Sequence, residues 1–284
     1  MNESIPPLVA VDWLASRLDQ PHIRILDATF FLPQQGRNAE LEFRREHIPG
    51  AAFFDIDRIA DLESTLPHML PSARQFADAA GKLGIDRDSH VVVYDNHSFM
   101  ASARVWWTLR VFGHDRVSVL DGGLKRWKSR GLPVEHPAGA AVFRRFRVDY
   151  RPSLVRCVDE ILQFLKTGNL QIVDARSPGR FAGIEQEPRP GLRPGHIPNS
   201  VNLPFTEVVD PESGCLKTPN ELGELFKNLG VSLEGPLTAS CGSGVTASIL
   251  ALALYCIGKQ DTAVYDGSWS EWGARSDTPV ATSG

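Results

Sequence analysis

The sequence is poor in cysteine, lacks a long apolar run and concentrates neither sign of charge. Its 284 residues include four cysteines, none of which stands in a CxxC pair. This excludes a disulfide scaffold and the zinc or thioredoxin-type motifs that need paired thiols, so we expect free thiols in a reducing compartment. No apolar run is long enough to span a membrane, and no basic segment precedes an apolar one at the N-terminus as in a signal peptide. We therefore predict a cytoplasmic protein without a membrane partner.

The charge balance excludes a second class of function. Acidic residues outnumber basic ones, 34 to 30, and the formal net charge is −4, which gives no reason to expect a nucleic-acid partner. The most basic run is Phe143–Arg147, which we interpret as a solvated connector. The composition, 42% hydrophobic and 23% charged, is that of a globular protein. A chain of this length is expected to form two domains.

An internal repeat predicts the architecture. Three segments recur in the same order and at nearly the same spacing: Ile25–Ala28 as Ile172–Ala175, His47–Gly50 as His196–Asn199, and Leu120–Gly123 as Tyr265–Ser268. The period is too long for a solenoid and indicates a duplicated domain. In each copy short apolar runs alternate with helical stretches, which predicts an α/β fold with a parallel sheet flanked by helices. We place the first domain at residues 18–138, a linker at 139–153 and the second domain at 154–280.

One cysteine stands where chemistry is expected in such a sheet. Cys241 follows a predicted strand at 236–239, and Gly242 and Gly244 separate it from a predicted apolar helix at 245–256. Ligands of parallel α/β sheets bind at the carboxyl ends of strands. Glycine lets the backbone curl around a bound group, and the N–H groups of such a turn, with the helix N-terminus, form an anion cradle. The partial positive charge of these N–H groups and of the helix N-terminus stabilises a thiolate, so we predict that Cys241 is a nucleophile. The alternative is a buried structural cysteine.

The segment Cys241–Thr246 resembles the active-site loop of the 3-mercaptopyruvate sulfurtransferase family, whose members are relatives of rhodanese, the thiosulfate sulfurtransferase. The resemblance covers nearly the whole chain and includes the tandem copies and the segments Arg104–Trp107 and Asp266–Trp269. It implies two tandem rhodanese-like domains, of which only the second carries the cysteine. The corresponding loop of the first copy, Tyr94–Phe99, has none, so the first copy resembles the family's non-catalytic domain, which covers the site.

The same resemblance implies the chemistry. Sulfur passes from a small-molecule donor to a persulfide on Cys241, and then to a thiol, to cyanide or to a thioredoxin. Neither a metal nor an organic cofactor is implied, and we expect a monomer. Gly242 and Ser243 bring no positive charge beside the sulfur, whereas rhodanese loops place basic residues there. We therefore favour 3-mercaptopyruvate, whose carboxylate lies several bonds from its sulfur, over the compact dianion thiosulfate.

The resemblance also implies the substrate-binding residues. Arg180 and Arg189 match the family's two substrate-binding arginines, and the planar fork of arginine suits a carboxylate. Arg176 and Arg193 lie in the same segment, so composition alone does not choose among the four. The loop residues predicted to line the substrate are Gly242, Gly244, Val245 and Thr246.

A serine–histidine–acid relay is the last feature that the resemblance suggests, with Ser243 and His47 as members. Histidine exchanges a proton near neutral pH. The alternative for His47 is that it braces a turn, because His196 occupies the same place in the other copy. The family's acid precedes the histidine, but the region directly before His47 contains Glu40, Glu42 and Glu46 and no aspartate. The alternative for Ser243 is that it only donates a hydrogen bond to the substrate and relays no proton.

Three other functions share parts of this sequence pattern. Rhodanese proper, acting on thiosulfate, is the nearest alternative. A phosphatase of the Cys-x5-Arg class is excluded, because residue 247 is alanine and supplies no guanidinium for a phosphate. A non-enzymatic binding module on the same fold is disfavoured by the intact Cys241 loop.

Overall fold

The chain folds into two compact units, one for each copy of the repeat. The computed structural model describes residues 5–96, 99, 101–136, 139 and 141–282. The first unit comprises Met1–Leu62, Leu70–Arg151 and Asp210–Leu216, and the second comprises Glu63–Met69, Pro152–Val209 and Lys217–Gly284. Each copy thus contributes a short segment to the other's unit. The predicted domain limit at 138 and residues 97–98 of the first-copy loop lie outside the described residues.

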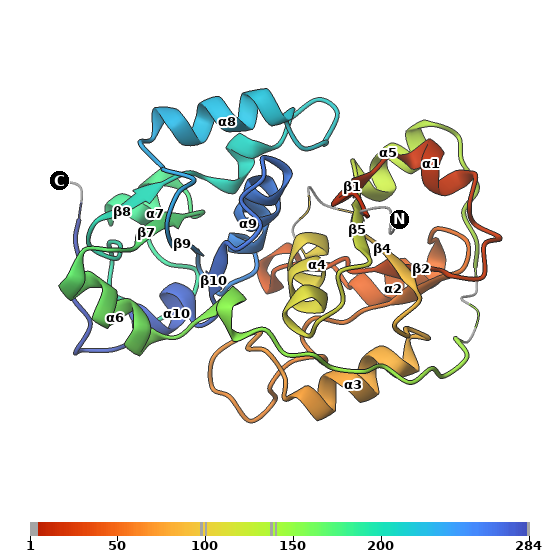
Figure 1. Ribbon diagram of the computed structural model, residues 1–284, viewed down its shortest axis with the longest axis horizontal. Coiled ribbons are helices and arrows are strands. Elements are labelled where there is room, and N and C mark those ends of the chain that lie inside the picture. Colours follow the sequence, from red (N-terminus) through yellow and green to blue (C-terminus); the bar gives the residue numbers. More distant parts are fainter. Residues whose placement is uncertain (1–4, 97–98, 100, 137–138, 140, 283–284) are drawn as a thin grey trace. The chain divides into compact units, whose positions relative to one another are not determined.

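The first unit is built on a five-stranded parallel sheet of order β1-β5-β4-β2-β3 (Figure 1). Its strands are β1 (Leu8–Val9), β2 (Ile23–Asp27), β3 (Ala51–Phe53), β4 (His90–Tyr94) and β5 (Val117–Leu120). Its α-helices are α1 (Val11–Ala15), α2 (Ala39–Arg45), α3 (Ala73–Lys82), α4 (Ser102–Val111) and α5 (Gly123–Ser129).

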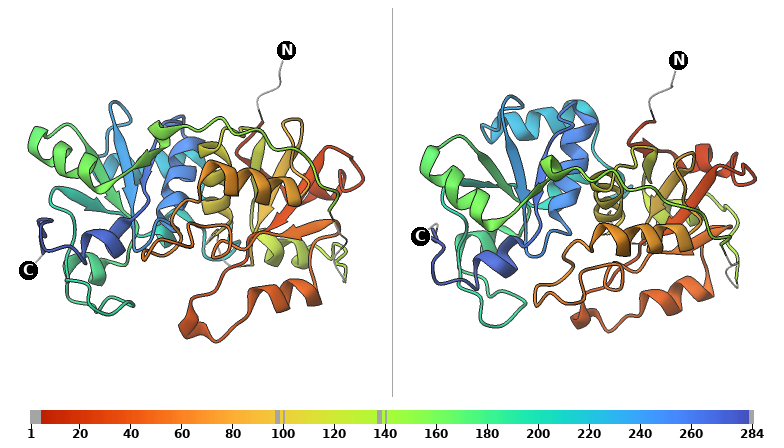
Figure 2. Two further views of the ribbon diagram at one scale, coloured as in Figure 1. Left: turned by 90° about the horizontal axis from the view of Figure 1, so that it is seen from below. Right: turned by 60° about the horizontal axis from the view of Figure 1, so that its bottom comes forward.

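The second unit repeats this arrangement with a parallel sheet of order β6-β10-β9-β7-β8. Its strands are β6 (Val155–Arg156), β7 (Gln171–Asp174), β8 (Ser200–Asn202), β9 (Leu237–Ser240) and β10 (Ala263–Tyr265). Its α-helices are α6 (Val158–Thr167), α7 (Pro178–Ala182), α8 (Pro219–Asn228), α9 (Ala247–Cys256) and α10 (Ser268–Trp272). Helices flank each sheet (Figure 2), which confirms the predicted fold class.

Local sequence explains where the principal helices begin. Ser72 and Gln75 form a reciprocal capping box at the start of α3, and Thr218 and Glu221 form one at the start of α8. Pro219 follows at the first helical position, where its missing N–H costs nothing. The edge strands β1 and β6 were not predicted, because two residues are too few for an alternating pattern.

The basic run Phe143–Arg147 is not a free connector. It belongs to the first unit, where Phe146 is buried and packs edge-on against Phe76. The Arg144 N–H donates to the Gly81 carbonyl over 2.9 Å. The predicted linker therefore packs on the first unit as far as Arg151.

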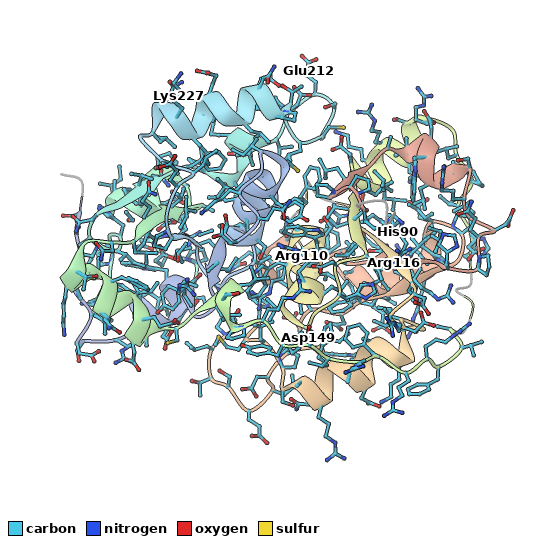
Figure 3. All side chains as sticks on the ribbon, viewed as in Figure 1. His90, Arg110, Arg116, Asp149, Glu212 and Lys227 are labelled. Atoms are coloured by element: carbon cyan, nitrogen blue, oxygen red, sulfur yellow. The ribbon has the colours of Figure 1, made fainter. Side chains whose placement is uncertain are left out.

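His90 and Arg116 lie at the amino-terminal edge of the first sheet. His90 begins β4 and lies near Arg116, which precedes β5 (Figure 3). Burial and the charge of Arg116 lower the pKa of His90 to about 4, so the side chain stays neutral and bonds to the Ser118 hydroxyl over 2.9 Å.

In the parts of the chain that the structure describes, no helix is long and apolar enough to cross a membrane.

Candidate active site

Cys241 lies at the turn between β9 and α9, at the carboxyl end of the second sheet's central strand. Its side chain is almost completely buried, with 1% of the residue exposed. Gly244 has a φ of 73°, a left-handed conformation that favours glycine. The sequence therefore folds the loop into a tight turn, and the helix that follows is apolar and buried.

A neighbouring turn holds the cysteine loop in place. The N–H groups of Cys241 and Gly244 donate to the Ser268 hydroxyl over 3.2 and 3.1 Å, and this hydroxyl donates to the Tyr265 carbonyl over 2.7 Å. The Trp269 N–H in turn donates to the Cys241 carbonyl over 2.9 Å. Ser268 therefore shapes the loop, a role that sequence reasoning missed. The repeat contained one signal of this role, because the first copy, which has no cysteine in its loop, has Gly123 at the position of Ser268.

The remaining N–H groups of the loop are available to an anion. Within the described residues, the N–H groups of Gly242, Ser243, Val245 and Thr246 donate to no protein acceptor. They lie beside Cys241 and before the N-terminus of the ten-residue helix α9. Such a set of donors stabilises negative charge on a bound group. The backbone geometry thus agrees with the predicted anion cradle.

One of the predicted arginines lies against this loop. A methyl group placed on Gly242 would be 3.0 Å from Nη2 of Arg180. Arg180 extends from α7 and pairs with Glu187, whose Oε2 accepts from Nη2 over 2.5 Å. The Glu187 side chain is 4% exposed, so the carboxylate holds the guanidinium in position. Sequence reasoning did not single out Glu187.

The structure separates the four arginines of this segment. Arg176 is buried and pairs with Asp174 and Glu187. Arg193 donates to the carbonyls of Gly273, Thr278 and Trp272. Both are structural. Arg180 and Arg189 are half-buried, and the contact with Gly242 distinguishes Arg180 as a substrate-binding candidate.

The predicted relay residues have different surroundings. Ser243 is 8% exposed and follows Cys241 by two residues. His47 is completely buried in the first unit, where its Nδ1 bonds to the Phe43 carbonyl over 2.8 Å and its ring stacks on Phe43. His196 makes the same two contacts with Phe181 in the second unit. This shared pattern supports the bracing role for His47, and the relay role remains a prediction.

Another histidine of the first copy belongs to the unit that contains Cys241. His68 lies in the segment Glu63–Met69, which is part of the second unit. It is half-buried and has a φ of 59°, which is uncommon for a residue other than glycine. Such strain is concentrated at functional sites. Sequence reasoning missed His68 because the repeat drew attention to His47 and His196.

The other three cysteines stand outside this loop in the sequence. Cys215 belongs to the first unit, where the Arg126 guanidinium donates to its Sγ over 2.6 Å and the N–H of Leu216 donates to the Asp121 carboxylate. Burial raises the pKa of the Cys215 thiol, which disfavours a thiolate. Cys157 is exposed and Cys256 is half-buried.

Comparison with known proteins identifies the family. The model of the rhodanese-like domain matches residues 10–130 and 158–275, once in each copy. The chain belongs to the 3-mercaptopyruvate sulfurtransferase family of tandem rhodanese-like proteins. It is 47% identical over 275 residues to the 3-mercaptopyruvate sulfurtransferase of Rattus norvegicus, covering 95% of this chain and 92% of the relative. The predicted family, fold and enzyme class are thus confirmed, and this chain is a sulfurtransferase.

Two further relatives are informative. The crystal structure of SseA from Escherichia coli, described as a 3-mercaptopyruvate sulfotransferase, superposes with a TM-score of 0.85 at 42% identity, covering 93% of this chain and 99% of that one. A thiosulfate sulfurtransferase of Rattus norvegicus is 44% identical, with 95% of this chain and 92% of the relative covered. Overall sequence identity therefore does not distinguish 3-mercaptopyruvate from thiosulfate as the sulfur donor, and the residues of the site must be compared.

Proposed function

We propose that this enzyme takes sulfur from 3-mercaptopyruvate and carries it as a persulfide on Cys241. The observation that carries the proposal is the loop itself, where four unused N–H donors lie beside a cysteine and Arg180 lies against Gly242. The loop backbone suits an anion on sulfur, and the guanidinium suits a carboxylate several bonds away. Gly242 and Ser243 add no charge next to the sulfur, which favours this donor over thiosulfate.

The reaction proceeds in two displacement steps. The Cys241 thiolate attacks the donor sulfur, and a sulfur–sulfur bond forms as the carbon–sulfur bond breaks. The electron pair of that bond leaves with pyruvate as its enolate, which takes up a proton. A thiol, cyanide or a thioredoxin then attacks the outer sulfur, and the Cys241 thiolate is regenerated. Neither step requires an external oxidant or reductant.

We favour His68 over His47 as the proton donor to the enolate. Two observations support this choice: His68 belongs to the same unit as Cys241, and its backbone is strained. Asp57 and Asp61 precede it, whereas no aspartate stands close before His47. His68→Gln should lower kcat and change its pH profile, while His47→Gln should lower the thermal midpoint. The reverse pattern would support the original sequence prediction.

The mass of the isolated protein tests the central proposal. After exposure to 3-mercaptopyruvate and removal of the donor, intact-protein mass spectrometry should show the gain of one sulfur atom. Peptide mapping should place that atom on Cys241. Addition of a thiol should remove it, with one pyruvate released for each sulfur loaded. Loading on Cys157, Cys215 or Cys256 instead would contradict the assignment.

A further inference from the structure

The first unit contains a cavity at the place where the second unit has its active site. The cavity has a volume of about 380 Å³ and lies where β2 and β4 end. Asp27 ends β2, Thr29 follows it, and Asn96 follows β4. Carboxyl ends of parallel strands are where ligands of α/β sheets bind. The function proposed above makes no use of this cavity.

Matching backbone hydrogen bonds establish which residues are equivalent in the two copies. The Ala28 N–H donates to the Tyr94 carbonyl as the Ala175 N–H donates to that of Ser240, both over 2.8 Å. The Leu124 N–H donates to the Asp95 carbonyl as the Trp269 N–H donates to that of Cys241. Asp27 therefore corresponds to Asp174, Thr29 to Arg176 and Leu124 to Trp269.

In the second unit, a guanidinium occupies this space. Arg176 donates to the Asp174 carboxylate over 2.7 Å and stacks on the Trp269 ring at 4.2 Å. In the first unit the equivalents Thr29 and Leu124 are much smaller. The guanidinium and the indole are both missing there, and the cavity opens beside Asp27 in their place.

Asp27 consequently lacks the cation that Asp174 has. It is 2% exposed, and its carboxyl group accepts from the Thr29 N–H over 2.8 Å and from the Tyr94 hydroxyl. In the described part of the chain no cationic side chain pairs with it. Burial raises the pKa of Asp27 to about 6, because neutral donors only partly replace the lost hydration. A bound cation would stabilise the carboxylate.

We propose that this cavity binds a small guanidinium compound, whose head group pairs with Asp27 as Arg176 pairs with Asp174. The planar fork of a guanidinium matches a carboxylate bidentately. Phe43 and Leu124 provide apolar walls for a short alkyl chain. Of the other carboxylates in the lining, Glu42 is paired with Arg37 over 2.6 Å and Glu46 with Lys128 over 2.5 Å. The buried Asp27 is therefore the carboxylate that recognises the ligand.

Calorimetric titration of the full-length protein at pH 7.5 tests this site. The probe is n-propylguanidinium, which reproduces the Arg176 side chain, and n-propylurea is its neutral isostere. We expect the cation to bind and the urea to bind at least about tenfold more weakly, the scale of one charge-assisted hydrogen bond. Asp27→Asn should remove this preference. Glu42→Gln, which removes a rim charge, should keep it.

Two cavity-filling variants provide a second line of evidence. Thr29→Arg supplies the guanidinium within the chain, and Leu124→Trp restores the indole found in the second copy. Either variant, if its circular dichroism is that of the wild type, should lose probe binding. Equal binding of the two probes, or unchanged binding by Asp27→Asn, would overturn the proposal. So would the absence of binding by the wild type, whatever the result for sulfur loading on Cys241.

Discussion

Each copy of the repeat carries an aspartate at the end of an equivalent strand, and the two aspartates have opposite surroundings. Asp174 is paired with the buried guanidinium of Arg176, while Asp27 has only neutral hydrogen-bond donors. The backbone bonds around both residues are nearly identical. The same sheet edge thus forms without this ion pair, because main-chain hydrogen bonds and apolar packing hold it together.

The residue equivalent to Cys241 also shows that the two copies share a backbone fold but differ in the side chains that carry chemistry. Asp95 takes its place in the first copy, and its carboxylate accepts from the N–H groups of Ala101 and Ser102 at the start of α4 over 3.1 and 2.9 Å. The first copy thus satisfies its helix N-terminus with its own anion. The second copy leaves loop N–H groups for an external one, so a change of side chain at one turn distinguishes the catalytic copy.

Removal of the nucleophile should have the strongest effect on activity. Cys241→Ser should abolish sulfur transfer while leaving the thermal transition unchanged, because a hydroxyl cannot carry sulfane sulfur. Pyruvate release and sulfur loading measure the loss. Cys157→Ser changes an exposed thiol and is the matched control. Near wild-type turnover by Cys241→Ser would break the distinction between the two copies.

The second prediction concerns the unpaired aspartate. The pKa of Asp27 rises from 3.8 to about 6 on folding, so the folded state binds its proton more tightly than the unfolded chain does. The associated stability is present below pH 3.8 and is lost as the pH rises through 6. It amounts to about 3 kcal/mol. Asp27→Asn should therefore raise the thermal midpoint at pH 8 and leave it nearly unchanged at pH 4. An equal gain at both pH values would show that Asp27 does not titrate in this range.

The third prediction concerns the arginine of the catalytic copy. Arg180→Ala should lower kcat/KM for 3-mercaptopyruvate by about 30-fold, equivalent to roughly 2 kcal/mol for a charge-assisted hydrogen bond. Arg275→Ala, which breaks an exposed pair with Asp277, is the control and should change little. Arg189→Ala tests the second predicted arginine in the same assay. Unchanged kinetics in Arg180→Ala would mean that another group binds the carboxylate.

Particular residues show how far the sequence alone can go. The repeat predicted a parallel sheet flanked by helices in each copy, and both sheets are present, because their central strands are buried apolar runs. Cys241 was predicted from its strand–turn–helix setting. Ser268 and Glu187 were not, because they act on partners that are distant in sequence and only the fold brings them together. His68 was not singled out either, because its membership of the second unit and its positive φ become visible only in the fold.

A weaker effect is expected from changing the loop charge, which tests whether that charge selects the sulfur donor. Wild type should have a higher kcat/KM for 3-mercaptopyruvate than for thiosulfate, and Gly242→Arg with Ser243→Lys should shift that ratio toward thiosulfate by roughly tenfold, about 1.4 kcal/mol. Gly242 does not have a left-handed φ, so its backbone accepts a side chain; the obstacle is Arg180, whose Nη2 would lie 3.0 Å from the new Cβ. Displacing that guanidinium would also disturb its pair with Glu187, so the thermal transition of the variant must be measured first.

Repulsion between Arg180 and the added arginine keeps the expected shift modest, since part of the attraction for the dianion is offset by two cations held close together. Gly242→Ala separates the contributions, because it adds bulk beside Arg180 without adding charge. The alanine variant should lower both activities and leave their ratio unchanged. If the doubly basic variant folds and keeps the wild-type preference, loop charge does not set donor specificity. If wild type itself prefers thiosulfate, the donor proposed here is wrong, while sulfur transfer through Cys241 stands.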